Sequence, residues 1–323
     1  TAFVCVTFVC LDIIYQLIFN QDIFGYAALD RRLSGPFGDE LIAGSFIQRF
    51  ALISLFLIPI FFKFKNIYTQ YLIITFFILL FLFAIILSGN RIPLIFFTLS
   101  IVAIIIFEQK LRKFLLIFLF IFFSSAFLMT NLNVNYKNHL SGFVTHVKQI
   151  LFFTSIKPAT EKFKKDYGKR YKFYSFEFKG KTYAYPNTYV KELVSGIIIW
   201  SDRKIFGGGV KSFRINCSKS KVLNCSTHPH NYYIELLADL GFVGFLIVFI
   251  IFSFLFIKIF ITKYFKKSHL NNYHLITPFI FLFFTEIFPI KTTGSFFSTN
   301  NATYIFLIMA IMLQLSKNKK SIE

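Results

Sequence analysis

Acidic residues are scarce in this chain. It has 15 Asp and Glu against 35 Lys and Arg, which gives a formal net charge of +20, yet all charged residues together make up only 15% of the chain. Apolar residues make up 56%, which is more than a soluble globular domain usually contains. A disordered chain could not keep so many apolar side chains hydrated. The composition therefore indicates a membrane protein with a strongly basic part.

Other signals are missing as well. The sequence has no internal repeat at a fixed period and no soluble catalytic domain. It opens at Thr1 without an initiator Met, so we expect an N-terminally truncated protein. The run Gly207–Ser212 lacks the spacing of a nucleotide-binding phosphate loop. Two interpretations remain for this run: a backbone turn that presents N–H groups to an anion, or a plain loop.

Apolar runs of roughly 20 residues are long enough to cross a bilayer as helices. About eight such runs are present, at residues 1–20, 41–62, 68–88, 92–108, 114–130, 240–262, 273–290 and 298–315. We therefore predict an all-α integral membrane protein with about eight transmembrane helices. The predicted organisation is helices in 1–130, a large loop in 131–239, and helices with a cytoplasmic tail in 240–323.

Basic residues mark every alternate short connection between these runs. Because cytoplasmic loops are enriched in Lys and Arg, we place the basic connections inside. They carry Lys63, Lys65, Lys110, Arg112, Lys113, Lys263, Lys266 and Lys267, and the tail carries Lys317, Lys319 and Lys320. The loop 131–239 then lies on the external side of the membrane.

This external loop holds 18 Lys and Arg against seven Asp and Glu. Nucleic acid is not expected outside the cytoplasm, so the charge favours an anionic substrate or lipid headgroups as partner. The alternative is a lysine-rich loop that is merely solvated. Residues 171–189 alternate polar and aromatic side chains, which predicts a hairpin. Residues 189–200 have helical spacing and predict an amphipathic helix.

Two of the four cysteines, Cys217 and Cys225, lie in the external loop, in a compartment that permits oxidation. Their pairing would close a short loop and contribute about 2.5 kcal/mol. A metal site with His228 and His230 is the competing interpretation, but the paired short Cys spacing of a zinc knuckle is absent. We therefore predict a disulfide and no metal.

Charged residues inside apolar runs are costly unless they pair or line a cavity. Asp12, Arg49 and Glu286 lie in the external halves of predicted helices, and Arg91 follows the external turn Ser88–Asn90. We expect Arg49 to contribute to a substrate cavity, with snorkelling to the surface as the alternative. Asp12 and Glu286 are expected to be structural partners of such arginines.

The densest polar cluster is Cys225–Asn231, which precedes a predicted short helix ending at Gly241. Ser226 or Thr227 is the expected N-cap of this helix. His230 is expected just above the membrane. Histidine exchanges protons near neutral pH, so His230 could take a proton from a hydroxyl group. The alternative is a structural role, which is the more frequent one for a lone histidine on an apolar face.

Four segments, in chain order, carry a family resemblance. They are Arg32 with residues 34–38, Ser88-Gly89-Asn90-Arg91, the 205–214 stretch with three glycines and Arg214, and His230-Asn231 followed after nine residues by Gly241 and Gly244. Together they resemble the bacterial O-antigen ligase and O-antigen polymerase proteins, which share a membrane domain.

The resemblance implies a membrane glycosyltransferase of glycosyltransferase C-like fold that needs no metal or other cofactor. Such an enzyme takes a glycan from a polyprenyl-pyrophosphate carrier at the periplasmic face of the bacterial inner membrane. It joins the glycan to a lipid A core, as a ligase, or to another glycan, as a polymerase. The partners implied are the lipid bilayer, the carrier-linked glycan and its acceptor, and no nucleic acid.

The resemblance also implies roles for individual residues. His230 would be the general base, and Arg91 and Arg214 would hold the departing pyrophosphate. Further residues expected to bind substrate are Arg203, Arg49, His228, Asn231 and Arg32. Residues expected to be structural are Cys217, Cys225, Gly241 and Gly244.

Two other classes of protein are weighed against this enzyme. A transporter or flippase of an anionic lipid-linked substrate would also use Arg and acid pairs inside the membrane. Such a transporter would be expected to show two halves with corresponding broken helices, and the sequence shows no such symmetry. A structural membrane subunit would leave the buried arginines unexplained.

Overall fold

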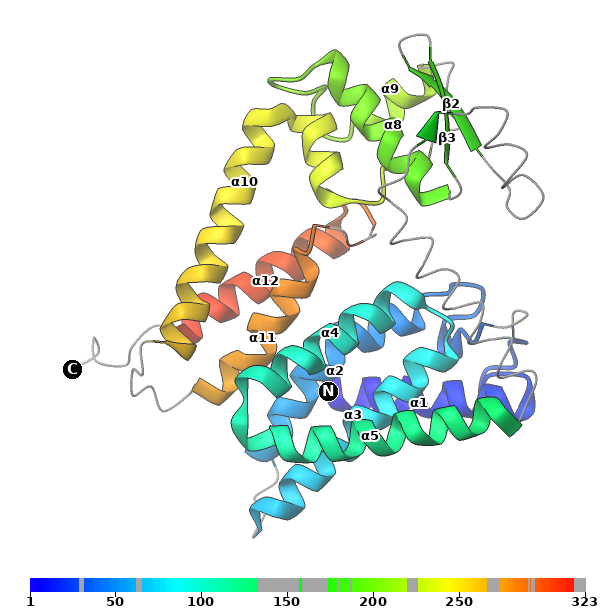
Figure 1. Ribbon diagram of the computed structural model, residues 1–323, viewed down its shortest axis with the longest axis vertical. Coiled ribbons are helices and arrows are strands. Elements are labelled where there is room, and N and C mark those ends of the chain that lie inside the picture. Colours follow the sequence, from blue (N-terminus) through cyan, green and yellow to red (C-terminus); the bar gives the residue numbers. More distant parts are fainter. Residues whose placement is uncertain are drawn as a thin grey trace. The chain divides into compact units, whose positions relative to one another are not determined.

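The computed structural model describes residues 1–28, 32–61, 66–132, 157–158, 174–178, 181–185, 188–219, 226–265, 273–289, 291 and 294–316. The chain forms two compact units (Figure 1). Unit 1 comprises Thr1–Asn133, Phe256–Glu286 and Phe306–Glu323. Unit 2 comprises Val134–Leu255 and Ile287–Ile305.

Unit 1 is helical. Its elements are α1 (Ala2–Phe19), the short 3-10 helix η1 (Gly35–Phe37), α2 (Ala43–Phe61), α3 (Ile67–Leu87), α4 (Arg91–Phe107), α5 (Gln109–Leu132) and α11 (Tyr273–Glu286). Helix α2 contacts α1, α3, α4 and α11, and its Ile47, Leu52 and Leu55 are fully buried. It is therefore the central helix of this unit.

The sequence of α3 shows why these runs form helices. It contains no Gly, no Pro and no charged residue, and Asn66 caps its first turn by accepting a hydrogen bond of 2.9 Å from the Tyr68 amide. Two further long helices, α10 (Tyr232–Tyr264) and α12 (Thr299–Ser316), have their first parts in unit 2 and their last parts in unit 1. Each of the eight predicted apolar runs coincides with a helix.

In the described part of the chain, α1, α3 and α10 are long and apolar enough to cross a membrane, judged by length and composition. Shorter apolar helices cover Ala43–Phe56, Arg91–Phe107 and Leu275–Glu286. These features support a helical membrane protein. The count of eight spans stays a prediction.

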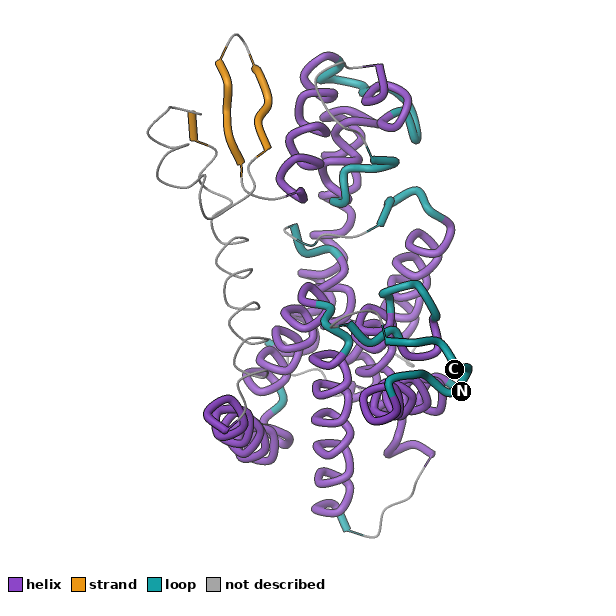
Figure 2. Tube along the Cα trace, turned by 90° about the vertical axis from the view of Figure 1, so that its right-hand side faces the viewer, coloured by secondary structure: helices purple, strands orange, loops and turns teal. Residues whose placement is uncertain are grey.

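A small sheet is the one departure from the all-α class among the described residues. Strands β2 (Tyr174–Phe178) and β3 (Lys181–Tyr185) pair antiparallel with Phe178 opposite Lys181, which confirms the predicted hairpin (Figure 2). The short strand β1 (Lys157–Pro158) pairs with the other edge of β3. The predicted helix in 189–200 is also confirmed, as α8 (Thr188–Asp202).

The rest of unit 2 is built on the first part of α10. Helix α9 (Phe213–Lys219) and α8 pack there, and Ile199, Phe213, Cys217 and Ala238 form a buried apolar cluster. Gly241 interrupts α10 with φ 70° and ψ −171°, which separates Tyr232–Leu240 from the long apolar segment that follows. The predicted end of a short helix at Gly241 is thus confirmed.

Candidate active site

The segment Ser226–Asn231, here named the histidine loop, is attached to α8 at two points. The Ser226 hydroxyl lies 2.9 Å from a carboxylate oxygen of Glu192, which is almost fully buried. One turn further along α8, Gly196 faces the end of the loop. A Cβ on Gly196 would lie 2.3 Å from Ile234 Cγ2 and 3.2 Å from Pro229 Cβ. A side chain at position 196 would therefore require Ile234 of α10, and to a lesser extent Pro229 of the loop, to move.

Asn231 closes the histidine loop and caps α10. Its Oδ1 accepts hydrogen bonds of 3.1 Å from the amides of both Tyr233 and Ile234. The expected N-cap at Ser226 or Thr227 is therefore wrong. Helix α10 cannot start earlier because His230 has a left-handed backbone, with φ 54°. These contacts engage the Asn231 side chain at the helix start, and its expected role in substrate binding stays a prediction.

His230 sits in this left-handed conformation between Pro229 and Asn231. A non-glycine residue with positive φ costs roughly 1–2 kcal/mol, and such strain is typical of functional positions. The ring of His228 lies next to it, with 4.2 Å between ring centroids. Nδ1 of His228 lies 2.9 Å from the Thr227 hydroxyl, with donor and acceptor set by the tautomer. Both histidines are partly exposed as residues, but Nε2 of His228 is buried.

The first part of α10 also anchors the segment 287–296. Asn231 Nδ2 donates to the Pro289 carbonyl at 2.6 Å, and the Tyr233 hydroxyl donates to the Ile287 carbonyl at 2.5 Å. Glu235, which is buried, accepts from the Ser295 hydroxyl and from the Phe296 amide, both at 2.5 Å. All these residues belong to unit 2. No local pattern of residues predicted this attachment.

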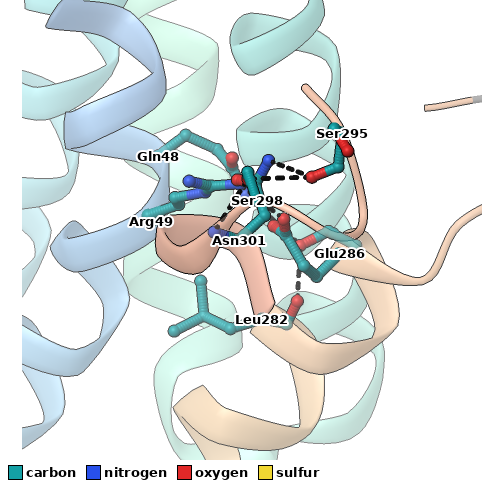
Figure 3. Close-up of polar contacts among 8 residues, drawn as sticks. Gln48, Arg49, Leu282, Glu286, Ser295, Ser298 and Asn301 are labelled. Carbon is teal, nitrogen blue, oxygen red and sulfur yellow. Dashed lines mark hydrogen bonds and ion pairs between the residues drawn. The ribbon is translucent and has the colours of Figure 1, made fainter. Parts of the chain in front are cut away.

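Further contacts hold Ser295 itself, as Figure 3 shows. The Ser298 hydroxyl donates to the Ser295 carbonyl at 2.9 Å, and Asn301 Nδ2 donates to the same carbonyl at 2.9 Å. The start of α12 therefore supports the segment that Glu235 binds.

Asp239 fixes the start of α9, which carries Arg214. The Asp239 carboxylate is fully buried and accepts from the Lys211 amide at 2.7 Å, the Ser212 hydroxyl at 3.0 Å and the Phe213 amide at 2.9 Å. A carboxylate at a helix N-terminus satisfies amides that lack partners within the helix. Arg214, the second residue of α9, is thereby held at a defined place relative to α10.

The glycine turn 207–209 packs directly on the interruption in α10. The amides of Gly208 and Gly209 donate to the carbonyls of Ala238 and Asp239 at 3.1 and 2.7 Å. These two amides are therefore not available to an anion, which leaves the plain-turn interpretation for them. A Cβ on Gly207 would lie 2.4 Å from the Asp239 carbonyl oxygen, and one on Gly241 would lie 2.3 Å from the Ile205 carbonyl oxygen. Both glycines are required because two backbones touch here.

Two arginines of the loop region are open to solvent, one expected to hold the pyrophosphate and the other expected to bind substrate. Arg203 follows α8 and Arg214 lies on α9, and both are exposed. Neither guanidinium group makes a hydrogen bond or ion pair with the residues that the structure describes. Unit 2 therefore combines His230, Asn231 and both of these arginines on connected elements.

Arg91 and Arg32 belong to unit 1. Arg91 is the first residue of α4 and follows a tight turn in which Gly89 has φ 68°. Helix α2 approaches this turn through Gly44, whose Cβ would lie 2.6 Å from the Ser88 hydroxyl. The turn that carries Arg91 is thus fixed by its packing on α2. Arg32 precedes η1 and is exposed.

Arg49 forms an ion pair with Glu286, in which Arg49 Nη2 lies 2.7 Å from Glu286 Oε1 (Figure 3). The Glu286 side chain is 1% exposed and that of Arg49 is 22% exposed. The expected structural partnership of Glu286 with an arginine is confirmed. For Asp12 the described contact is a hydrogen bond of 2.8 Å that Oδ1 accepts from the Ile23 amide, and its expected pairing with an arginine stays a prediction. The role of Arg49 in substrate binding stays a prediction.

The remaining predicted residues concern covalent and metal chemistry. Cys217 is buried and disulfide-bonded. Its predicted partner, Cys225, lies outside the described residues. Gly244 faces the Leu240 side chain, one turn earlier on α10. Within the described ranges, no group of three or more His, Cys, Asp and Glu residues could hold a metal ion.

Sequence reasoning missed the roles of Glu192, Gly196 and Asp239. A glycine inside a stretch of helical spacing was the available signal for Gly196, because such a glycine weakens a helix unless close packing requires it. The hydrogen-bond partner of Glu192 lies 34 positions away in the sequence. Those of Asp239 lie between 26 and 28 positions away. No local pattern reports a contact of that kind.

The comparisons with known proteins identify a family for the segment that contains these residues. A family profile described as O-antigen ligase matches residues 76–249, which is more than half of the chain and includes Arg91, the glycine turn and His230. No curated protein matches the chain. A match over this length shows membership and supports a glycan-transferring membrane enzyme. The chain therefore belongs to the O-antigen ligase family.

Proposed function

We propose that this protein transfers a glycan from a polyprenyl-pyrophosphate carrier to an acceptor sugar at the periplasmic face of the bacterial inner membrane. The proposal includes eight membrane-spanning helices, with the region 131–239 external. The observation that carries it is the fixed, left-handed His230 between α8 and the capped start of α10, inside the matched family segment.

In the proposed reaction, His230 takes the proton of an acceptor hydroxyl group. The hydroxyl oxygen bonds to the anomeric carbon of the carrier-linked glycan, and the bond from that carbon to the pyrophosphate oxygen breaks. The electron pair leaves with the carrier pyrophosphate. Guanidinium groups stabilise this developing charge, since they bind phosphate oxygens with two parallel hydrogen bonds.

The exposed side chain of Arg214 makes it the first candidate for this role in unit 2, followed by Arg203. Arg91 is proposed for the same role from the sequence resemblance. His228, Arg32 and Arg49 are proposed to bind the glycan or its carrier. Asn231 is proposed to act through His230, because its amide group is already engaged by α10 and by segment 287–296. In this scheme, arginines neutralise the pyrophosphate and no metal ion is required.

The test uses the purified full chain in lipid vesicles, with polyprenyl-pyrophosphate-linked glycan as donor. Lipid A core and free carrier-linked glycan are offered as acceptors in separate reactions, each with and without a chelator. We expect a larger glycolipid in one of them, unchanged by the chelator. Growth of the lipid A core identifies a ligase, and growth of the carrier-linked glycan identifies a polymerase. No product with either acceptor, while the donor binds, would contradict the proposal.

A further inference from the structure

Unit 2 exposes a group of apolar side chains at the glycine turn. Ile205 is 61% exposed, Phe206 76% and Val210 60%. These three residues are named the apolar tip. Large apolar side chains gathered at one place on a surface mark a site of contact with a protein or a membrane. The question is which partner covers the apolar tip.

The backbone ties the apolar tip to the start of the long apolar segment of α10. The Phe242 amide donates to the Lys204 carbonyl at 2.8 Å, and the Val243 amide donates to the Ile205 carbonyl at 3.2 Å. Ile205 and Phe206 therefore lie at the depth at which this segment begins. Phe242 and Val243 are themselves 50% and 39% exposed, so the apolar surface continues from the tip onto the helix.

The length of the segment sets that depth. From Phe242 to Ile261 there are about 20 residues, which span roughly 30 Å at 1.5 Å per residue, the thickness of the hydrocarbon core. The only charged residue between them is Lys258, near the far end. Because the whole segment is needed to cross the bilayer, Phe242 lies at the boundary between hydrocarbon and headgroups. Ile205 and Phe206 of the apolar tip lie at the same level.

The polar groups around the apolar tip fit this placement. Turn amides of Gly207, Gly208 and Gly209 all donate to carbonyls, so contact with lipid leaves none of the three without a partner. Exposed cations flank the tip on both sides, at Arg203, Lys204, Lys211 and Arg214. Long basic side chains beside buried apolar ones reach toward phosphate groups at a membrane surface.

We infer that the apolar tip inserts into the headgroup and upper acyl-chain region of the lipid bilayer, beside the membrane-spanning part of α10. Its occupant is phospholipid, because the apolar surface is continuous with a membrane-crossing helix and is bordered by cations. The insertion places the side chains of Arg203 and Arg214 at the level of lipid phosphates. This inference concerns membrane contact and does not depend on the proposed transfer reaction.

The test measures depth by fluorescence. Trp200 is the single tryptophan, so Trp200→Phe gives a silent background into which Phe206→Trp is introduced. The protein is reconstituted in phosphatidylcholine and phosphatidylglycerol vesicles whose acyl chains carry bromine either near the headgroup or near the chain end. Phe254→Trp is the matched control. Phe254 is 65% exposed and lies about 18 Å beyond Phe242 along α10, deeper in the bilayer.

We expect shallow bromine to quench the tryptophan at position 206 at least about twofold more than deep bromine does, with the opposite order at position 254. Acrylamide in the water should quench position 206 weakly. The inference is overturned if brominated lipid does not quench position 206 and acrylamide quenches it fully. If Phe206→Trp does not fold, Val210→Trp in the same background replaces it. Quenching by shallow bromine then supports the inference, and full quenching by acrylamide without quenching by bromine overturns it.

Discussion

Asp239 accepts a hydrogen bond of 2.9 Å from the backbone amide of Phe213, the residue directly before Arg214. The same carboxylate also binds the Lys211 amide and the Ser212 hydroxyl. A buried group on α10 thus holds the start of α9 and, through it, an arginine proposed to hold pyrophosphate. Asp239 is a positioning residue in this scheme, since it reaches the substrate only through Arg214.

Asp239→Asn replaces one acceptor oxygen with an amide donor, which then faces a backbone N–H or the serine hydroxyl. We expect a loss of about 1–3 kcal/mol in the free energy of unfolding, measured by denaturant titration in mixed micelles. We also expect KM for the carrier-linked glycan to rise several-fold, with a smaller change in kcat. Asp202→Asn, at the exposed end of α8, is the matched control. Equal changes in both variants would contradict the positioning role.

His230→Asn removes the imidazole group but keeps a residue that can adopt the left-handed backbone conformation of position 230. Asn tolerates positive φ better than most residues, so the protein should keep its thermal stability. The amide cannot accept the hydroxyl proton, so transfer should fall by about 10²–10⁴-fold. The measurement is product formation under saturating donor, with Ser218→Ala on the exposed surface of α9 as control. Activity within threefold of the parent protein would remove His230 from the role of base.

Arg91→Lys keeps the charge but removes the planar fork that binds two phosphate oxygens at once. If Arg91 holds the pyrophosphate, transfer should fall by about tenfold or more, because a bidentate contact is lost as charge develops on the leaving group. The measurement is kcat with the purified protein in vesicles. Lys113→Arg, in the α5 region predicted to be cytoplasmic, is the control. An unchanged rate in Arg91→Lys would show that the fork is not used.

Variants of the Arg49–Glu286 ion pair test whether Arg49 has a structural role only or also binds substrate. Arg49→Met leaves the buried Glu286 carboxylate without this cation, and we expect a loss of about 3–5 kcal/mol in the free energy of unfolding. The double variant Arg49→Met/Glu286→Leu should recover most of that stability. If Arg49 also contacts substrate, the stable double variant stays poorly active. Full activity in the double variant would confine Arg49 to a structural role.

Gly241→Ala tests the contact between the glycine turn and α10. The added Cβ would lie 2.3 Å from the Ile205 carbonyl oxygen, so the turn must move and both stability and transfer should fall. Gly209→Ala is the matched control, because Gly209 also has positive φ but nothing lies within 4 Å of its Cβ position. It should lose only about 1–2 kcal/mol from backbone strain. Equal decreases in thermal stability in the two variants would show that backbone strain alone, and not the close contact with Ile205, accounts for the effect.

Several elements could be predicted from the sequence because their signals are local. Continuous apolar runs located the eight helices, and alternation around Lys179–Lys181 located the hairpin. The N-cap of α10 was misplaced because the pattern of Ser226, Thr227 and Pro229 resembles a helix start. The left-handed backbone of His230, which moves that start to Asn231, leaves no trace in residue spacing.

The candidate site could be predicted only in part, because many of its contacts join residues far apart in the sequence. The family motifs bring His230, Arg214 and the glycines to attention, but not the residues that hold them. Glu235 binds residues 60 and 61 positions further along the chain. Such partners are chosen by packing, so neither helical periodicity nor composition can identify them.

The contacts from α10 to segment 287–296 are mostly with main-chain atoms. Asn231 and Tyr233 donate to carbonyl oxygens of Pro289 and Ile287, and Glu235 accepts from the Phe296 amide. Every residue type offers the same carbonyl group, so most substitutions at positions 287 and 289 leave these hydrogen bonds in place. The side chains at these two positions can therefore vary without removing the hydrogen bonds that hold the start of α10.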